Sequence, residues 1–528
     1  MEHPTQMKVL PSAAWDQIYQ KFQQPQAPPP PPPPPPTTTT ALCLRISAAQ
    51  PVAAGGEVDV LLRLETPELT QGSRIPVDII CILDISGSMS MEAKIQSSEG
   101  SGGLNLLDVA KHGVKTVMHA LHDEDRLALV LFDNYADIAW ELTFMTAEGR
   151  KSCEEKLTPV CTRGGTNIWN GLEEGLKVCR QGQGIQGDQC GKRLAHLILL
   201  TDGQTTGRNE VLPNMVAAKG AEERLPCTVS TFGFGYNIDS NLLVDMAHNG
   251  FGVYSFIPDA GFVGTVFVNY VSNLLSTMSL SAMLVVDPEG GQIQEVYGGL
   301  KVEDVGEGRK CVDLPILQYG QSKDVVLRLS VDPSLGPEAY LSANAICTLA
   351  SGEELQTFQE AWSSQACHPH EVCKELWRLR FAHGLEQAVQ MAEDRRYPSA
   401  ALELLTQLSN EIEQHSRQNG YDQEQFILDL LQDLQGEATD AVAPTAFQKW
   451  GRHYLPSLMF AHKRQMCNNF KDPGVQHYGG EMFKELREEA DEKFNLLPPP
   501  EPTNRSTLHG YTTPAVRSMA MYNDASAG

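Results

Sequence analysis

The chain has 528 residues, too many for one hydrophobic core, so we expect about two to four domains. Its 41 basic residues face 66 acidic ones, and the formal net charge of -25 argues against an extended contact with nucleic acid, which needs clustered positive side chains. The twelve cysteines are sparse, and several lie in apolar runs, as is typical of proteins in a reducing compartment.

Residues 1–40 are proline-rich and cannot build a core. A short amphipathic piece at 15–22 precedes nine consecutive prolines, from Pro28 to Pro36. As a polyproline II helix they extend about 28 Å, at about 3.1 Å per residue. We expect this segment to be disordered and to act as a spacer, with binding to a profilin, SH3 or WW module as the alternative.

The sequence lacks the usual signals for membrane insertion. It does not open with basic residues followed by an apolar stretch, and no window reaches about 18 uninterrupted apolar residues. We therefore expect no membrane span and a cytoplasmic location.

In two segments apolar and polar residues alternate, as in β-strands with one solvent-exposed face. In residues 41–74, apolar side chains alternate at 42–46 and 58–64, separated by the turn-prone Ala-Ala-Gly-Gly. Residues 276–365 show the same alternating pattern, with candidate strands at 280–286, 324–329 and 340–349. We expect both segments to form one β-sandwich. The intervening domain is then either inserted into this sandwich or flanked by it.

Between these segments, residues 75–275 alternate strand and helix signals. The run 77–83 is nearly all apolar, as in a central strand that helices cover on both faces. Further strands are expected at 126–132, 138–142, 194–200, 228–234 and 252–257, and helices at 104–121, after Thr166, at 212–223 and at 241–246. This alternation predicts an α/β fold, a doubly wound, Rossmann-like domain with a mostly parallel sheet.

Strand signals end near residue 366, and helical periodicity continues to about residue 500. Apolar positions at 376–392 and 401–412 predict a helical hairpin. Further helices are expected at 425–434, 447–470 and 482–497, the last ended by three prolines. Residues 366–500 thus form an α-helical C-terminal region, and residues 501–528 a tail.

Oxygen-bearing side chains follow two predicted strands and one glycine-rich loop. Asp84, Ser86 and Ser88 come directly after the first apolar run. Thr166 follows Arg-Gly-Gly before a helix, and Asp202 follows the strand at 194–200. The carboxyl ends of parallel strands meet at one edge of a sheet, where ligands bind. Two carboxylates and three hydroxyls suit a small hard cation such as Mg²⁺ and leave room for a further carboxylate from a partner.

On these five residues, the domain at 75–275 resembles a von Willebrand factor type A domain with a complete metal-ion-dependent adhesion site. The resemblance implies that Ser86, Ser88 and Thr166 bind the ion directly, and that Asp84 and Asp202 bind it directly or through water. It implies a non-enzymatic module in which a protein ligand offers an Asp or Glu to Mg²⁺, with Mn²⁺ and Ca²⁺ as alternative ions. In the other interpretation the ion only fastens the three loops.

Over about residues 41–520 the chain also resembles the plant group that includes the Wavy-growth RING ubiquitin ligases. The likeness rests on the order of the domains and on a C-terminal stretch from Tyr511 to Met519. In that group an intein-associated region follows the type A domain. A RING needs paired Cys-x-x-Cys or Cys-His ligands, and this chain has no Cys-x-x-Cys. Ligase activity is therefore not expected, and an adaptor or regulator beside such a ligase is the alternative function.

Other chemical sites have weaker support. A phosphatase of the haloacid dehalogenase type needs a second acid two residues after the first, where this chain has Ser86, and no Walker phosphate-binding motif occurs. Cysteines and histidines crowd together at 367–373, but without a second cysteine pair we expect no zinc site there. We expect surface or helix-cap positions for three further histidines, His112, His119 and His122.

Overall fold

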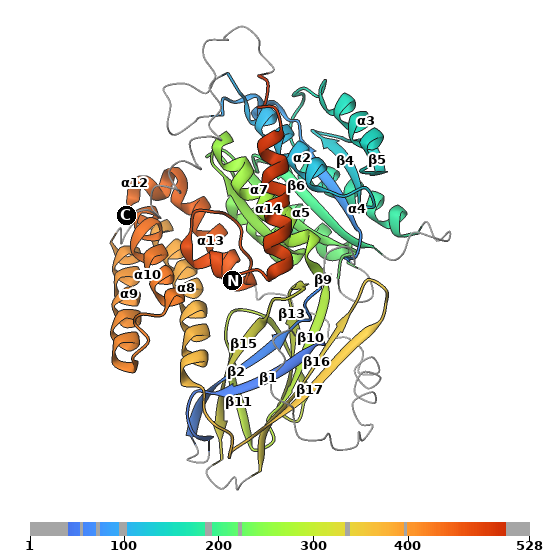
Figure 1. Cartoon of the computed structure of the whole chain (residues 1–528). Helices are drawn as coiled ribbons and strands as arrows, with labels where there is room; N and C mark the ends of the chain where they lie inside the picture. The colour runs from blue at the N-terminus through green and yellow to red at the C-terminus, as the bar shows by residue number, and fades with distance from the viewer. Residues whose placement is uncertain are drawn as a thin grey trace.

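The computed structural model of the chain describes residues 41–52, 56–69, 74–93, 103–184, 193–219, 224–332, 338–394 and 399–502. An α/β domain, a β-sandwich and a group of C-terminal helices lie side by side (Figure 1). In these ranges no helix is long and apolar enough to cross a membrane. The predictions for the proline-rich segment, and for nearly all of the tail, fall outside the described residues.

A six-stranded sheet with the order β5-β4-β3-β6-β7-β8 forms the α/β domain. Its strands are β3 (Val77–Asp84), β4 (Arg126–Phe132), β5 (Ala136–Phe144), β6 (Leu194–Thr201), β7 (Thr228–Phe234) and β8 (Phe251–Ile257). Neighbouring strands are parallel except β4 and β5, which pair antiparallel at the edge. The predicted doubly wound α/β fold is confirmed.

The direction of winding reverses between β3 and β6. From β3 the chain moves to β4 and β5, and from β6 it moves the other way to β7 and β8. At such a switch point the following loops diverge and leave a crevice at the carboxyl ends of the strands. The loops after Asp84 and Thr201 leave the sheet there.

Helices cover both faces of this sheet. The helices on one face are α2 (Leu106–Ala120) and α7 (Val263–Leu275), and those on the other are α4 (Ile168–Gly184), α5 (Arg208–Ala217) and α6 (Ser240–Asn249). A short helix, α3 (Ala147–Leu157), packs against β5 and α2. All eight residues of β3 are buried, which is why residues 79–83 are apolar without alternation.

The β-sandwich consists of two sheets, β1-β2-β15-β11 and β12-β13-β10-β16-β17. Their strands are β1 (Cys43–Ala48), β2 (Gly56–Glu65), β10 (Ser281–Asp287), β11 (Gly291–Val296), β12 (Lys301–Gly306), β13 (Arg309–Leu314), β15 (Lys323–Val331), β16 (Ala339–Thr348) and β17 (Glu354–Trp362), with a separate short pair, β9 (Thr277–Ser279) and β14 (Leu317–Gln318). Because β2 precedes the α/β domain and pairs antiparallel with β15 after it, the α/β domain is inserted into the sandwich.

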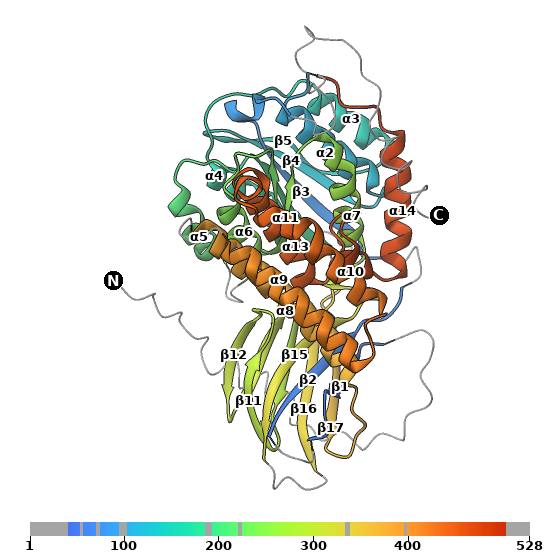
Figure 2. The same cartoon turned by 90° about the vertical axis from the view of Figure 1, so that its left-hand side faces the viewer.

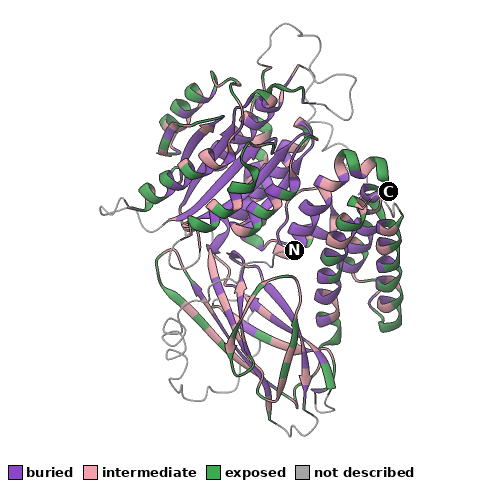
Figure 3. Ribbon diagram, turned by 180° about the vertical axis from the view of Figure 1, so that it is seen from behind, coloured by how far each residue is buried: buried purple, intermediate pink, exposed green. Residues whose placement is uncertain are grey.

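The C-terminal helices share their core with the α/β domain. They are α8 (Pro369–Glu393), α9 (Ala400–Asn419), α10 (Gln425–Asp433), η4 (Leu434–Ala438), α11 (Thr439–Val442), α12 (Pro444–Ala446), η5 (Phe447–Gly451), α13 (Arg452–Arg464), η6 (Pro473–His477) and α14 (Glu481–Leu496). Helices α8 and α9 form the predicted hairpin (Figure 2). Helix α13 packs on β8 and α6, and α14 packs on α2 and α7. The buried sides of these helices face the neighbouring parts (Figure 3).

Some predicted helix boundaries are wrong. The helix expected at 447–470 ends at Arg464, because Gln465 takes a left-handed conformation with φ 49°. Beyond it, the side chain of Asn469 accepts the backbone N–H groups of Lys471 and Asp472 at 2.7 and 2.8 Å, which holds a loop instead of a helix. The helix expected at 212–223 spans Arg208–Ala217, and residues 220–223 fall outside the described ranges.

The surface position expected for His112 is also wrong. The residue is 8% exposed, and its ring lies 5.4 Å from that of Phe494 on α14. Burial lowers the pKa of His112 to about 4, so the ring is neutral. His119 and His122 keep partly exposed positions near the end of α2.

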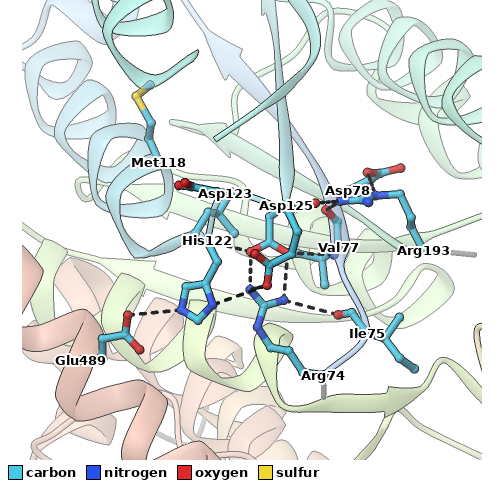
Figure 4. A network of polar contacts seen from close by, with 12 residues as sticks. Arg74, Ile75, Val77, Asp78, Met118, His122, Asp123, Asp125, Arg193 and Glu489 are labelled. Carbon is cyan, nitrogen blue, oxygen red and sulfur yellow. Dashed lines mark hydrogen bonds and ion pairs between the residues drawn. The ribbon is translucent and has the colours of Figure 1, made fainter. Parts of the chain in front are cut away.

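A buried ion pair anchors the segment that enters β3. Arg74 donates to Asp125 through both terminal nitrogens, with Nη1 at 2.8 Å from Oδ1 (Figure 4). Asp125 also accepts the backbone N–H groups of Val77 at 3.0 Å and of His122 at 2.8 Å. The His122 ring contacts Glu489 of α14 at 3.2 Å. One carboxylate therefore joins the entrance of β3 to the turn after α2, and that turn contacts α14.

Candidate metal centre

The first loop of the predicted site begins where β3 ends. Asp84 is the last residue of this buried strand and is itself fully buried. Its Oδ1 accepts the backbone N–H of Ser86 at 2.8 Å, and its Oδ2 accepts the hydroxyl of Thr201 at 2.6 Å. These two bonds fix the carboxylate at the switch point between β3 and β6.

Ser86 and Ser88 follow on a single tight turn, η2 (Gly87–Ser90). Their hydroxyl oxygens lie 3.0 Å apart. Two ligands at neighbouring corners of an octahedron with bonds of about 2.1 Å are separated by about 3.0 Å, the arrangement that Mg²⁺ prefers. The two serines are therefore spaced as adjacent ligands of one small cation.

The loop that carries Thr166 is fastened to the other two loops through its backbone. Gly87 donates to the carbonyl of Gly164 at 3.1 Å, and Arg163 donates to that of Ile85 at 2.6 Å. The carbonyl of Thr166 accepts the backbone N–H and the hydroxyl of Thr206, at 2.9 and 2.8 Å. The structure thus brings the three predicted loops together at one edge of the sheet.

Asp202 follows β6 and is 1% exposed. Within the described residues, its buried Oδ2 makes no hydrogen bond of ordinary geometry, although the hydroxyl of Ser88 lies close to this carboxylate. Gly203 continues the chain at a φ of +78°, and a Cβ there would lie 2.9 Å from the backbone nitrogen of Asp239, so glycine is required. A buried carboxylate oxygen without a hydrogen bond is costly unless something else satisfies it.

The two carboxylates share a low-dielectric site. Burial is the main reason why the pKa of Asp84 is raised to about 7, and the nearby charge of Asp202 also raises it. Burial raises the pKa of Asp202 as well. Among the ion pairs of the described residues, none joins either carboxylate to a basic side chain. A bound cation would remove this repulsion and favour the charged forms.

The donor set fits a hard cation better than a soft one. In the described part of the chain, no three His, Cys, Asp or Glu side chains gather in an arrangement that could hold a metal, and this includes the crowded segment 367–373. The candidate centre has only two carboxylates, and its other three side-chain donors are hydroxyls. Oxygen donors of this kind suit Mg²⁺, Mn²⁺ or Ca²⁺.

Sequence reasoning missed two residues that support the site. Thr201 fixes Asp84 from the neighbouring strand and accepts the N–H of Gly203 at 2.9 Å. Asp133 lies against Gly164, where a Cβ would approach its Oδ2 to 2.6 Å. The sequence could have indicated Thr201, because a hydroxyl side chain stands at the last position of the strand, directly before Asp202. Asp133 carried no signal of its own, because its role depends on the packing of two distant loops.

Comparisons with known proteins agree with this fold. The family model described as von Willebrand factor type A domain matches residues 78–267, and the one described as VWA / Hh protein intein-like matches residues 424–492. A solved von Willebrand factor type A protein from Catenulispora acidiphila superposes with a TM-score of 0.54 at 16% identity, and the match covers 74% of this chain and 89% of that one.

Two curated relatives match parts of the chain. An uncharacterized protein of Synechocystis is 27% identical over 188 residues, which are 35% of this chain and 39% of the relative. The probable E3 ubiquitin-protein ligase WAVH2 of Arabidopsis thaliana is 24% identical over 271 residues, 49% of this chain and 33% of the relative. The chain thus covers well under two thirds of either relative. It contains a von Willebrand factor type A domain, followed by a VWA / Hh protein intein-like region.

Proposed function

We propose that this chain is a divalent-cation-dependent protein-binding module. Its five predicted ligands, Asp84, Ser86, Ser88, Thr166 and Asp202, hold Mg²⁺, and the ion supplies a Lewis-acidic position for an Asp or Glu of a protein partner. One observation carries the proposal: the buried Oδ2 of Asp202 makes no hydrogen bond of ordinary geometry in the described structure and stands beside a second buried carboxylate. A cation satisfies both groups.

The residues of this chain set the position of the partner's carboxylate. Thr201 and the N–H of Ser86 orient Asp84, and the contact between Gly87 and Gly164 fixes the serine loop to the threonine loop. Because most of the donors are neutral hydroxyls, the ion keeps affinity for one more negative ligand. The proposal assigns no enzymatic activity to the chain. It also places the chain in the cytoplasm.

A second candidate function is an adaptor or regulator in a ubiquitin-ligase assembly. The observation that favours it is the match to WAVH2, which extends over about half of this chain. The absence of Cys-x-x-Cys from the sequence argues against ligase activity of its own. A third interpretation gives the ion a purely structural role, fastening the three loops with no partner bound to it.

Removal of divalent ions is expected to release the partner. The full chain, immobilised on beads, should retain specific proteins from a cell extract in MgCl₂, lose them in EDTA, and recover them when excess Mg²⁺ is added back. Exchange of one Asp or Glu of the identified partner for Asn or Gln should abolish binding, because an amide is a far weaker ligand of Mg²⁺ than a carboxylate. Asp84→Ala should fail to retain these proteins in MgCl₂, while the matched control Asp123→Ala, which removes an exposed carboxylate from the turn between α2 and β4, should retain them.

Three other outcomes would count against this proposal. Capture that is indifferent to EDTA contradicts the proposal. Ubiquitin-conjugating or ligase components that stay bound in EDTA favour the adaptor. Stabilisation of the chain by Mg²⁺, with partner binding unaffected by the acid-to-amide exchange, favours the structural ion.

A further inference from the structure

We propose that the partner site extends beyond the cation to two exposed apolar side chains, Tyr135 and Met91, one beside the threonine loop and one beside the serine loop. The preferred ligand is then a peptide segment whose Asp or Glu reaches the ion while aliphatic or aromatic neighbours pack on these two side chains. This inference rests on the proposed function and specifies the chemistry of its partner.

Tyr135 is held rigidly beside the threonine loop. Its backbone N–H donates to Oδ1 of Asp133 at 2.8 Å, and its carbonyl accepts the N–H of Asp133 at 2.9 Å. The other oxygen of Asp133 accepts Nε of Arg163 at 3.1 Å and faces Gly164, two residues before Thr166. Tyr135 is nevertheless 75% exposed. A fixed backbone with an exposed aromatic ring loses little conformational entropy on binding.

Met91 directly follows the serine loop. Its backbone N–H donates to the carbonyl of Ser88 at 2.9 Å, and its own carbonyl accepts the N–H of Leu106 at 3.0 Å. Met91 as a whole is 39% exposed, and few large apolar residues reach the surface in the described ranges. Methionine adapts its shape to different apolar partners. An adaptable apolar side chain thus borders the serine loop, and an aromatic one borders the threonine loop.

Charge explains why such contacts are needed. The net charge of -25 opposes the approach of an acidic peptide. The nearby guanidinium of Arg163 is occupied by Asp133 and Asp137 and does not turn the rim positive. Only the ion itself thus attracts a carboxylate, and the carboxylate of the partner replaces a water molecule bound to the ion. Apolar contacts beside the ion supply affinity that electrostatic steering does not, and they select among acidic sequences.

A peptide library tests this inference directly. Phage-displayed random peptides are bound to the full chain in MgCl₂ and eluted with EDTA. The eluted sequences are expected to carry an Asp or Glu with aliphatic or aromatic residues close by. Against a synthetic peptide from this pool, Tyr135→Ala should weaken binding about tenfold, while Tyr135→Phe should keep it within about twofold, since the ring makes the contact.

Phe358→Ala is the matched control, because it removes another exposed aromatic ring, on β17 of the sandwich, and should leave affinity unchanged. Asp84→Ala separates the two proposals. If EDTA elution and dependence on Asp84 hold but Tyr135→Ala binds like the wild type, or the peptides lack apolar residues, only the extended site is contradicted. If EDTA elutes no enriched peptide, or Asp84→Ala still binds, the cation-dependent function fails as well.

Discussion

Asp84→Ala is expected to remove measurable Mg²⁺ binding. Asp84 supplies one of only two carboxylates of the candidate centre and orients the serine loop through the N–H of Ser86. Loss of a group that merely supports a metal ligand costs about 10- to 100-fold in affinity, so loss of a charged ligand should cost at least about 100-fold. Isothermal titration with MgCl₂ should give a clear isotherm for the wild type and none for the variant.

Two further variants separate binding from folding. Asp84→Asn keeps an acceptor for Ser86 but removes the charge, so it should fold like the wild type and still bind the ion poorly. Thr201→Val removes the hydroxyl donated to Asp84 at 2.6 Å and leaves all five predicted ligands in place, so its loss should be about tenfold. Wild-type affinity in Asp84→Ala and Asp84→Asn would exclude Asp84 from the centre.

Asp125→Ala is expected to lower the free energy of unfolding by about 3–5 kcal/mol, the range for a buried ion pair that loses one partner. Asp125 is fully buried, and the side chain of Arg74 is only 4% exposed, so the guanidinium would remain charged without its main acceptor. The backbone N–H of Val77 would lose its acceptor as well. Denaturant unfolding followed by circular dichroism measures the difference.

Asp123→Ala is the matched control for this effect. Asp123 lies two residues away, and its 71% exposed side chain pairs with Arg150 at 3.1 Å. Exposed pairs contribute about 0–1 kcal/mol, so this variant should unfold nearly like the wild type. Equal stabilities of the two variants would show that the Arg74–Asp125 pair does not anchor the entrance of β3.

The sequence predicted the central sheet well because burial on both faces leaves a strong pattern. β3 alternates between two cores, with Ile79 and Cys81 toward α2 and α7, and Ile80 and Ile82 toward α4, so residues 79–83 form an unbroken apolar run that ends at Asp84. Polar residues at the ends of such strands indicated a site at the switch point. The structure brings their three loops together, and cation binding stays a prediction.

Other elements gave weak signals for physical reasons. Helix α3 buries only Cys153 and Leu157, so its sequence shows no amphipathic period. Helix α7 has apolar residues at helical spacing, but the sheet and α14 together bury nearly its whole length, polar Asn269 and Asn273 included, and this second contact leaves no local pattern. The burial of His112 depends on Phe494, which lies far away in the sequence. Contacts between distant segments decided these features, and local patterns do not record them.

The central claim is that three loops hold one divalent cation at the edge of the sheet. Crystals of the full chain grown with MnCl₂, with anomalous diffraction recorded at the manganese edge, test it most directly. The account predicts one strong anomalous peak about 2.1–2.2 Å from the hydroxyl oxygens of Ser86 and Ser88, beside Thr166 and the two aspartates. Ordered loops with no peak between them, or manganese bound only elsewhere, would contradict it.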